Sequence, residues 1–429
     1  MPAKIQAVRG MHDILPVDAH RWRLIENTII RVINSYGYEE IRLPIVEKTD
    51  LFARSIGAYT DIVSKEMYTF NDRNNDSLTL RPEGTAGCVR AGLEHGLFHN
   101  QICKLWYLGS MFRHERPQKG RQRQFHQIGI EAFGLAGPDI DAEMIILCAR
   151  IWRELHMPDL RLELNTLGSA QSRRQYREQL VEYFSARQDE LDEDSRQRLH
   201  HNPLRILDSK NPDMQALINA APVIHELLDT EAAEHFAALR ALLDAAKISY
   251  IVNPRLVRGL DYYGKTIFEW TTTLLGAQGT ICAGGRFDGL VEQFGGKPTP
   301  AIGCALGLER LLELVGGRAE QITNTHPHVY LVVADEVDIK HGMFLSEFLH
   351  EQLPGLRVQV HYGGGSFKSQ FRKADNSGAR LALVLGPAEV AGGTVGIKYL
   401  REEAAQETVA TADLPASLRR RLAPDLNLA

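Results

Sequence analysis

The stretch FRHERPQKGRQRQFHQIGIE, residues 112–131, is the part of the sequence that decides the fold. Its flanks, CKLWYLGSMFR and RQFHQIGIEAFG, predict two paired strands, so most of its basic residues fall on the loop between them. Five basic residues occur within eleven positions: Arg113, Arg116, Lys119, Arg121 and Arg123. A guanidinium group binds two phosphate oxygens at once, so this loop suits a polyphosphate, a nucleic-acid backbone or both. The alternative interpretation is a solvated basic hairpin.

The second predicted strand has two chemically different faces, because side chains alternate along a strand. Phe125, Gln127, Gly129 and Glu131 share one face. The other face is mostly apolar and is expected to pack on helices: His126, Ile128, Ile130 and Ala132. Gly129 has no side chain, so we expect a gap there through which a small ligand approaches Gln127 and Glu131. Arg113 ends the first strand and is expected near the same ligand.

Composition and charge limit the possible function classes. The 429 residues are 44% hydrophobic and 24% charged, as in ordinary globular proteins, and the net charge is −5. Any nucleic-acid contact must therefore come from local basic patches. The N-terminal MPAKIQAVRG lacks the apolar segment of a signal peptide, and no apolar run reaches the ~18 residues of a membrane helix. The five cysteines are scattered without a CxxC pair, which argues against a zinc site and a disulfide framework. We expect a soluble, reduced, cytoplasmic protein.

The sequence divides into four segments. Residues 1–170 contain a predicted helix at 18–36, a strand interrupted by Pro44, and the strand pair described above. Residues 171–250 are charged and helical in period, so they are interpreted as an insertion into a sheet-based domain. That domain resumes over residues 251–320, where strand-like sequence returns.

The sheet-based domain ends with AIGCALGLERLLELV, residues 301–315, which we predict to be one apolar helix. Arg310 in this helix either lies on the solvent face or reaches a phosphate, because arginine is seldom buried without a partner. Residues 321–429 form the fourth segment, in which apolar strand patterns alternate with helical ones. This alternation predicts a small α/β domain.

The turn TLRPEGTAG, residues 79–87, follows a predicted strand. Glu83 and Thr85, with Gly84 between them, can present a carboxylate and a hydroxyl to an ammonium group. The alternative is a simple capping turn, in which Glu83 or Thr85 starts the next helix. The residues alone leave both interpretations open.

The segment LVRGLDYYGKTIFEW, residues 256–270, places Arg258 close to Tyr262 and Tyr263 at an expected strand start. These side chains can bind a carboxylate or phosphate and a polar ring. The alternative is a pair of tyrosines packed in the sheet, with Arg258 and Asp261 as an ion pair. The following CAGGRFDGL lets the backbone approach a ligand closely, but the sequence contains no GxxxxGK[ST] phosphate loop.

Together these motifs resemble a known family. A proline-interrupted strand after a helix, an FRxE strand–loop–strand and a GLER helix resemble, in this order, the three signature motifs of class II aminoacyl-tRNA synthetases. LVRGLDYY and AGGRFDGL closely resemble two segments particular to the histidyl-tRNA synthetase family. The resemblance covers essentially the whole chain. One departure is Phe287, where the second segment commonly has tyrosine.

The resemblance implies an α+β fold: a six-stranded antiparallel sheet flanked by helices, with a helical insertion and a C-terminal α/β anticodon-binding domain. It also implies a homodimer with Pro44 at the interface, and no membrane contact. The implied reaction joins L-histidine and ATP to give histidyl-adenylate and pyrophosphate, and then transfers the histidyl group to the 3′ end of tRNA(His). Mg²⁺ is expected on the β- and γ-phosphates of ATP, with no metal held by the protein alone.

The resemblance implies roles for the residues of an amino-acid pocket: Glu83, Gly84, Thr85, Gln127, Glu131, Arg258, Tyr262 and Tyr263. Glu83 and Thr85 should hold the α-ammonium group of histidine, with help from Gln127. Glu131 and Tyr263 should hydrogen-bond the imidazole nitrogens. Such a site leaves buried polar groups unpaired with any other amino acid, so it should discriminate strongly.

ATP contacts are implied in the same way. Phe125 should stack on adenine, Arg113 should bind the α-phosphate, and Arg121 and Arg310 should bind the outer phosphates. Arg258 should stabilise charge between the histidine carboxylate and the α-phosphate, where relatives use a metal ion. The expected catalytic residues are Arg258, Arg113 and Gln127.

The expected contacts with tRNA lie in two places. Arg116 and Gln118, at the tip of the basic loop, are candidates for contacting the tRNA acceptor end. The C-terminal domain is expected to bind the anticodon. Its segment SFKSQFRKADNSG predicts an amphipathic helix with Phe367, Phe371 and Ala374 inward and its basic side chains outward. Lys119 and Arg123 of the basic loop receive no role.

Two rival functions are considered. The first is a synthetase-like regulatory subunit of histidine biosynthesis, which is a binding module. It typically lacks the anticodon-binding domain and has degraded RGLDYY and glycine-rich segments. This chain keeps the C-terminal α/β domain, RGLDYY and the glycine-rich segment. A class II synthetase for another amino acid is disfavoured by Glu131 with Tyr263, since a carboxylate beside a phenol suits imidazole. Neither a HIGH nor a KMSKS sequence occurs, which excludes class I synthetases.

Overall fold

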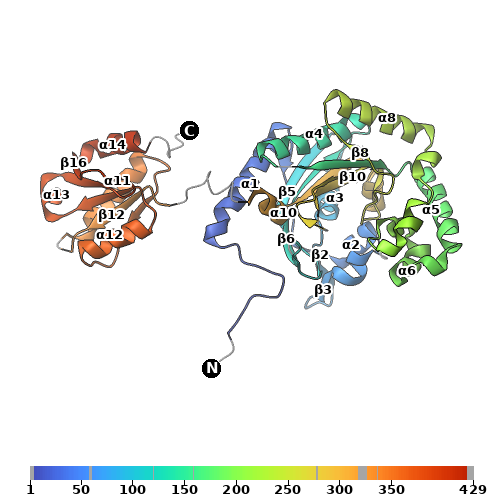
Figure 1. The fold of residues 1–429 in the computed structure, drawn as a ribbon, viewed down its shortest axis with the longest axis horizontal. Helices are drawn as coiled ribbons and strands as arrows, with labels where there is room; N and C mark the ends of the chain where they lie inside the picture. Colours follow the sequence, from blue (N-terminus) through green and yellow to red (C-terminus); the bar gives the residue numbers. More distant parts are fainter. Residues whose placement is uncertain are drawn as a thin grey trace. The chain divides into compact units, whose positions relative to one another are not determined.

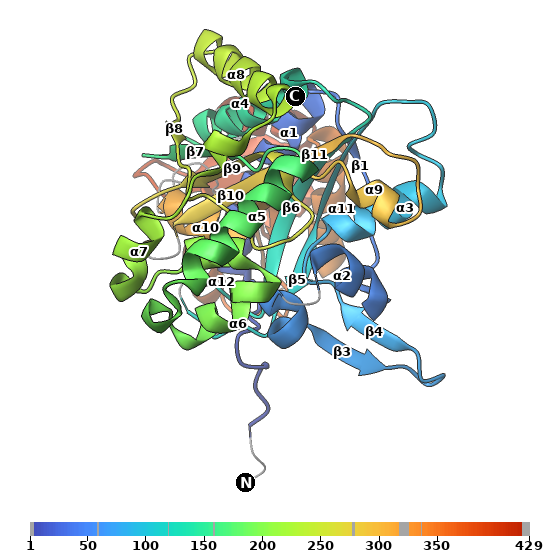
Figure 2. The same cartoon turned by 90° about the vertical axis from the view of Figure 1, so that its right-hand side faces the viewer.

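The computed structural model describes residues 4–57, 60–118, 120–157, 159–276, 279–316, 326–335 and 337–422. The chain forms two compact units, Met1–Thr323 and Asn324–Ala429, and each is a sheet covered by helices (Figures 1 and 2). Across the described ranges, none of the helices is both long enough and apolar enough to span a membrane.

The first unit is built on an eight-stranded sheet with the order β1-β5-β6-β11-β10-β9-β7-β8. Its strands are β1 Glu39–Glu40, β5 Cys103–Phe112, β6 Gln124–Phe133, β7 Arg161–Thr166, β8 Ile251–Val252, β9 Gly264–Thr271, β10 Thr280–Arg286 and β11 Ala301–Gly307. The six strands from β5 to β7 pair antiparallel, whereas β1 and β8 add a short parallel strand at each edge. The predicted six-stranded antiparallel sheet is therefore confirmed, with two short extensions.

One face of this sheet is covered by apolar helices: α1 Pro16–Ser35, α4 Pro138–Glu154, α8 Thr230–Ala245 and α10 Leu308–Val315. Ile128, Ile130 and Ala132 of β6 pack into the same buried cluster as these helices. The apolar face predicted for the second strand of the basic hairpin is thus confirmed. The opposite face of β6 is left to carry polar groups.

The other face of the sheet meets α3 Thr85–Glu94 and the first three helices of the segment predicted to be an insertion, whereas its last helix, α8, packs on the first face. The insertion contains α5 Ala170–Ser185, α6 Glu193–His201, α7 Gln215–Asn219 and α8, joined by short 3-10 turns. Three of its helices begin at a side chain that accepts a backbone N–H: Ser169, Asp192 and Asp229. These caps satisfy donors that a helix start otherwise leaves unpaired.

The segment around Pro44 does not form one strand. It divides into β1 and β2 Val46–Lys48, and β2 belongs to a separate sheet with β4 Ser77–Leu80 and β3 Tyr68–Asn71. The chain then turns into α2 Thr49–Ile56. Pro44 has no N–H to donate, so a continuous ladder cannot pass through it.

The prediction of one helix over residues 301–315 is wrong. Ala301–Gly307 is strand β11, near the centre of the main sheet, and only Leu308–Val315 is helical. A strand covered on both faces has no apolar–polar alternation, so its sequence resembles a buried helix. LVRGLDYY is likewise not a strand start but a loop that precedes β9, and the short helix α9 Leu290–Gln293 follows AGGRFDG.

The second unit is a five-stranded sheet with the order β13-β12-β14-β15-β16. Its strands are β12 Val329–Val333, β13 Val358–Val360, β14 Leu381–Leu385, β15 Thr394–Tyr399 and β16 Glu407–Ala410, and its helices are α11 Ile339–Gln352, α12 Phe367–Asn376, α13 Pro387–Gly392 and α14 Leu414–Arg421. The α/β prediction for this segment is confirmed. In α12, Ala374 is buried and Phe371 is partly buried, but Phe367 is 40% exposed, so its predicted inward position is wrong.

Candidate active site

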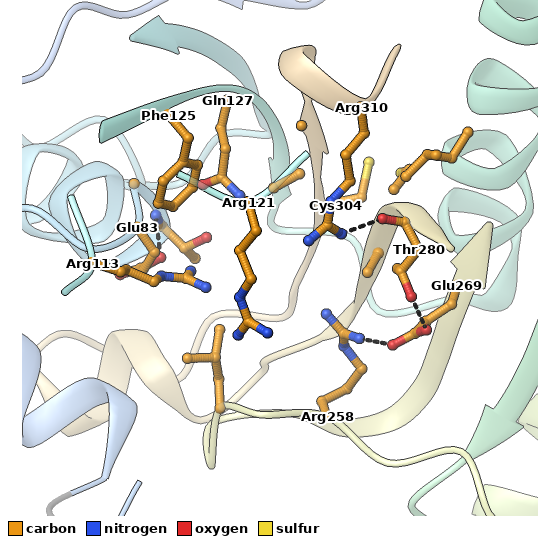
Figure 3. A pocket seen from close by; sticks show the side chains of 18 of the residues that line it. Glu83, Arg113, Arg121, Phe125, Gln127, Arg258, Glu269, Thr280, Cys304 and Arg310 are labelled. Atoms are coloured by element: carbon orange, nitrogen blue, oxygen red, sulfur yellow. Dashed lines mark hydrogen bonds and ion pairs between the residues drawn. The ribbon is translucent and has the colours of Figure 1, made fainter. Parts of the chain in front are cut away.

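A cavity of about 280 Å³ opens on the polar face of the main sheet (Figure 3). Most of the predicted site residues line it: Glu83, Gly84, Thr85, Arg113, Arg121, Phe125, Gln127, Arg258, Tyr262, Tyr263 and Arg310. They come from the loop between β5 and β6, from β6, from α10, from the start of α3 and the turn before it, and from the loop before β9, which are far apart in the sequence. Two parts of the cavity differ in chemistry: a bottom rich in buried acceptors and phenols, and a wall rich in arginine.

Glu131 is 1% exposed and does not itself line the cavity: it lies behind Thr85 and Tyr107, which do, and its Oε2 faces Gly303. Its Oε1 accepts a hydrogen bond from Thr85 Oγ1 at 2.8 Å and from the Tyr107 phenol at 3.0 Å. Its Oε2 is buried and has no hydrogen-bond partner in the described structure. Burial raises the pKa of Glu131 to about 8, although the hydrogen bond from Thr85 opposes that shift. A buried acceptor of this kind is costly unless a ligand donates to it.

The gap expected beside Gly129 is filled by a side chain of the protein. Tyr107 lies opposite Gly129 in the β5–β6 ladder, and a methyl group at Gly129 would lie 2.1 Å from the Tyr107 Cζ. A methyl group at Gly84 would lie 2.2 Å from the Tyr107 Cε2. The two glycines therefore make room for the tyrosine ring and not for a ligand. Tyr107 was not among the predicted site residues, because only the strand register brings it beside Gly129.

The turn before α3 fits both of the interpretations left open for it. Glu83 accepts the backbone N–H of Thr85 at 2.6 Å and of Ala86 at 2.9 Å, so it caps the helix. It is also 4% exposed and lines the cavity. Burial raises the pKa of Glu83, and the two backbone hydrogen bonds oppose this shift. The cap fixes a carboxylate at the edge of the cavity.

Four arginines converge on the cavity wall: Arg113, Arg121, Arg258 and Arg310. Burial lowers the pKa of Arg113, Arg121 and Arg310, and the charges of Arg121 and Arg113 lower that of Arg310 further. Arg113 also lies over the Phe125 ring, with its Cζ 5.2 Å from the ring centroid. Like charges held this close are stabilised when an anion lies between them. The wall therefore suits a phosphate chain.

Arg258 is oriented by Glu269, a residue that the sequence analysis missed. Its guanidinium donates to the Glu269 carboxylate, which also accepts from Thr280 Oγ1 at 2.9 Å (Figure 3). The Arg258 and Glu269 side chains are only 17% and 16% exposed. Arg310 donates to the backbone carbonyl of Thr280 and, at 3.2 Å, to that of Gly120. One signal was present in the sequence: Glu269 is a lone carboxylate in the apolar strand TIFEW.

The residues of the basic loop differ in what they contact. The buried Glu115 forms ion pairs with Arg121 and with Arg113, the latter at 4.0 Å. Arg123 donates to the carbonyl of Glu115, and its backbone N–H binds the carbonyl of Gly10, so it positions the N-terminal segment. Arg116 and Gln118 are exposed and do not line the cavity. Lys119 lies outside the described residues.

The two tyrosines of LVRGLDYY form an aromatic edge of the cavity. Their ring centroids are 4.7 Å apart, and Arg258 lies 5.6 Å from the Tyr263 ring centroid. Burial raises the pKa of Tyr263 to about 12, so its phenol keeps its proton at neutral pH. Phe287 is buried and packs edge-on against Tyr262 at 5.8 Å. The phenylalanine at this position therefore supports the pocket through its ring.

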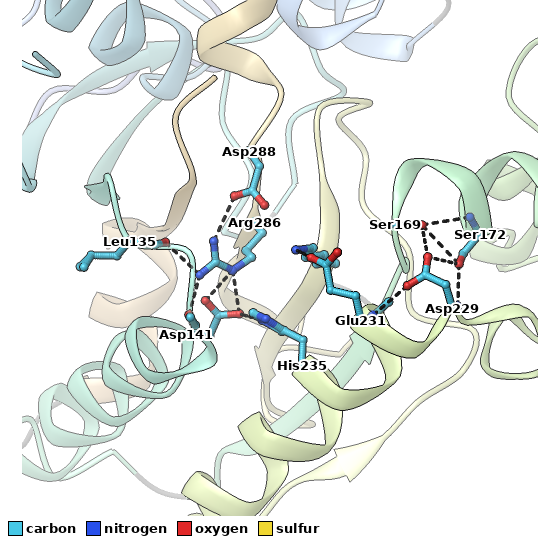
Figure 4. Close-up of polar contacts among 12 residues, drawn as sticks. Leu135, Asp141, Ser169, Ser172, Asp229, Glu231, His235, Arg286 and Asp288 are labelled. Carbon is cyan, nitrogen blue, oxygen red and sulfur yellow. Dashed lines mark hydrogen bonds and ion pairs between the residues drawn. The ribbon is translucent and has the colours of Figure 1, made fainter. Parts of the chain in front are cut away.

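The glycine-rich segment contributes a buried ion-pair network beside the site (Figure 4). Arg286 is fully buried and pairs with Asp141 at 2.8 Å and with Asp288 at 3.0 Å. Asp141 also accepts hydrogen bonds from His235 at 2.8 Å and from Thr266 at 2.6 Å. His235 belongs to α8, so the network ties the insertion to the sheet.

Comparisons with known proteins agree with this geometry. Residues 10–311 match the family model described as histidyl-tRNA synthetase, and residues 343–421 match the one described as anticodon binding domain. The chain is 58% identical to the histidine–tRNA ligase of Halorhodospira halophila over 415 residues, which are 97% of this chain and 98% of that protein.

Two solved structures extend the comparison. The apo histidyl-tRNA synthetase of S. aureus is 34% identical, with a TM-score of 0.80 over 97% of this chain and 100% of that one. The histidyl-tRNA synthetase of Nostoc sp. PCC 7120 is 21% identical, with a TM-score of 0.67 over 98% of this chain and 100% of that one. The second likeness concerns the fold alone.

Proposed function

The chain belongs to the histidyl-tRNA synthetase family and is therefore an ATP-dependent histidine–tRNA ligase; we propose that the cavity described above is where it activates histidine. In the proposed reaction, the histidine carboxylate attacks the α-phosphate of ATP, which releases pyrophosphate and leaves histidyl-adenylate. The histidyl group then passes to the 3′ end of tRNA(His). The protein supplies position and charge, and no protein nucleophile is needed.

The bottom of the cavity is proposed to bind histidine. The observation that carries this proposal is the buried Glu131 Oε2, which has no partner in the described structure although Oε1 has two. An imidazole N–H is a donor that fits this acceptor, and the Tyr263 phenol is proposed to serve the second ring nitrogen. Glu83 and Thr85, with Gly84 and Gln127, are proposed to hold the α-ammonium group. A smaller or apolar side chain would leave Glu131 unpaired.

The arginine wall is proposed to bind ATP. Arg113 is assigned to the α-phosphate, Arg121 and Arg310 to the outer phosphates, and Phe125 to adenine. Arg258 is proposed to stabilise the charge that develops between the carboxylate and the α-phosphate, with Glu269 holding its guanidinium in position. Arg113 and Gln127 complete the proposed catalytic set.

Mg²⁺ supplies charge compensation on the ATP phosphates when it is bound. The carboxylates that line the cavity among the described residues already have partners: Glu83, Glu115, Glu269 and Glu309. The phosphates are therefore proposed to provide the main ligands for Mg²⁺.

The remaining assignments concern partners. Arg116 and Gln118 are exposed and are proposed to contact the tRNA acceptor end, and the second unit is proposed to bind the anticodon. A homodimer is proposed through Pro44, Ile45 and Val46, three consecutive exposed apolar residues that would gain burial in an interface. Because tRNA charging serves translation, we propose that the protein acts in the cytoplasm.

Amino-acid-dependent ATP–pyrophosphate exchange across all twenty amino acids tests the proposal. Histidine alone should support exchange, and absence of exchange with histidine would remove the proposed activity. Glu131→Gln should impair histidine activation far more than dimerisation. Unchanged histidine kinetics in this variant would move the imidazole pocket elsewhere.

A further inference from the structure

Three of the five cysteines meet in space although they are far apart in the sequence. Cys148 lies on α4, Cys282 on β10 and Cys304 on β11. The Cys148 Sγ is 3.8 Å from the Cys282 Sγ and 3.7 Å from the Cys304 Sγ, and all three Sγ atoms lie within 4.8 Å of one another. In the described part of the chain, no other group of His, Cys, Asp and Glu side chains is placed to share a metal ion.

We propose that these three thiols form a binding site for a soft d¹⁰ cation, such as copper(I) or cadmium(II), in the wall of the active-site cavity. The site, here called the three-thiol site, was not foreseen from the sequence because no two of its residues form a CxxC pair. It is separate from the Mg²⁺ that accompanies ATP, because Mg²⁺ takes oxygen ligands.

The sulfur spacing fits metal coordination. Thiolate bonds of about 2.3 Å, as made to zinc, place two sulfurs about 3.8 Å apart in a tetrahedral site and about 4.0 Å apart in a trigonal one. The two separations from Cys148 are 3.8 and 3.7 Å. An ion can therefore bind with little movement of the sheet or of α4.

A fourth sulfur selects for a soft ion. The Met144 Sδ lies 3.5 Å from the Cys304 Sγ, and Met144 precedes Cys148 by four residues on the same face of α4. A thioether is a weak ligand for hard cations but a good one for soft cations, and thiolates share that preference. The donor set thus excludes Mg²⁺ and Ca²⁺ by its chemistry.

The charge of a bound ion can be balanced by loss of protons from the thiols. The three thiols belong to an apolar buried cluster, where a centre with net charge would be costly. One divalent ion bound by two thiolates, with the third thiol and the thioether neutral, gives a neutral centre and sends two protons to solvent.

The strands that carry two of the thiols also border the cavity, although the three sulfurs pack on the helix-covered face of the sheet. Cys282 and Cys304 line the cavity beside the small side chains of Ala283 and Ala305 (Figure 3 labels Cys304). An occupied three-thiol site would join α4 to β10 and β11, and β10 begins at Thr280, which contacts both Glu269 and Arg310. Metal binding is therefore expected to slow histidine activation.

The test titrates the reduced full-length protein with Cd²⁺ and follows thiolate-to-cadmium charge-transfer absorbance and proton release. One equivalent of Cd²⁺ should bind and release two protons. Cys148→Ala should lower the affinity at least about 10-fold, since changes even outside the ligand set of a metal site have effects of that size. Met144→Leu, which conserves volume, should give a smaller loss. If Cys148→Ala does not fold, Cys282→Ala takes its place.

Matched controls use the two cysteines outside the site. Cys88 is buried and Cys103 is partly exposed, so Cys88→Ala and Cys103→Ser should leave Cd²⁺ binding unchanged. Wild-type affinity in Cys148→Ala, or loss of the signal in Cys103→Ser, would overturn the proposal and leave the cluster as apolar packing. Because Cd²⁺ binding is measured without ATP–pyrophosphate exchange, its failure is distinguishable from failure of the proposed ligase reaction.

Discussion

The carboxylate of Glu269 accepts a hydrogen bond from the guanidinium of Arg258, and both side chains are more than four-fifths buried at the edge of the cavity. A buried arginine with a fixed partner is pre-organised, which is the condition for stabilising charge in a transition state without reorganisation. Glu269 lies on β9, and the Thr280 hydroxyl holds its other side. The pair therefore places a positive charge at a fixed point of the sheet.

Arg258→Ala should lower the rate of histidine-dependent ATP–pyrophosphate exchange by about 10² or more. The melting temperature should also fall, because the buried Glu269 carboxylate loses its partner, so the rates are compared at a temperature where both proteins are folded. Glu269→Gln should lower kcat by roughly 10-fold, because the arginine stays but its position is less fixed. In the double variant the two losses should not add. Glu154→Gln is the matched control, since this carboxylate pairs with Arg31 and Arg150 and does not line the cavity. A rate near wild type in Arg258→Ala would remove that residue from the mechanism.

Tyr107→Phe removes one donor to Glu131 and keeps the ring between Gly84 and Gly129. The loss of one such hydrogen bond is worth about 1 kcal/mol, so the KM for histidine should rise by roughly 5-fold. Tyr38→Phe serves as control, because the Tyr38 phenol contacts Glu143 outside the cavity. Equal histidine kinetics in wild type and Tyr107→Phe would show that the phenol does not position Glu131.

Gly129→Ala should abolish most histidine activation, because its methyl group would displace the Tyr107 ring. Combining it with Tyr107→Ser should restore folding stability but not activity, since the space returns and the phenol does not. Gly289→Ala is the control: its Cβ would meet no atom within 4 Å, and it should behave as wild type. Full activity in Gly129→Ala would contradict the described packing.

Stability should depend on pH through Glu131. Burial raises its pKa in the folded chain from 4.5 to about 8, so between these values the unfolded chain has lost a proton that the folded chain keeps. The free energy of unfolding therefore falls as pH rises through this window. Glu131→Gln has no such proton, so its stability relative to wild type should increase from about pH 5 to about pH 8. Urea melts of both proteins without histidine measure this, and a difference that stays constant with pH would refute it.

The parts of the fold that follow from local pattern were predictable. The alternation of Phe125, Gln127, Gly129 and Glu131 indicated which face of β6 carries polar groups, and the strand has that orientation. The run AIGCALG, which is β11, was misassigned as helix because both faces of a central strand are covered. Hydrophobic periodicity alone cannot distinguish a central strand from a buried helix.

The parts of the site that depend on register were not predictable. Tyr107 on β5 lies opposite Gly129 on β6, and Glu269 on β9 meets Arg258, which precedes it by eleven positions on the loop before that strand. Neither contact has a signal in local sequence beyond a lone polar residue among apolar ones. The three thiols likewise come from α4, β10 and β11, so sequence spacing gave no indication of their meeting.

The strand β6 also sets a length. Phe125 and Glu131 lie six residues apart on one face, which corresponds to about 20 Å at the rise of an antiparallel strand. Adenine is proposed to bind at Phe125 and imidazole at Glu131. The spacing of these two residues along β6 therefore fixes the distance between the two ends of bound histidyl-adenylate. An inhibitor that joins a purine to an imidazole should therefore show a sharp optimum in linker length, and shortening or extending the linker by a few atoms should cost more affinity than changing its chemistry.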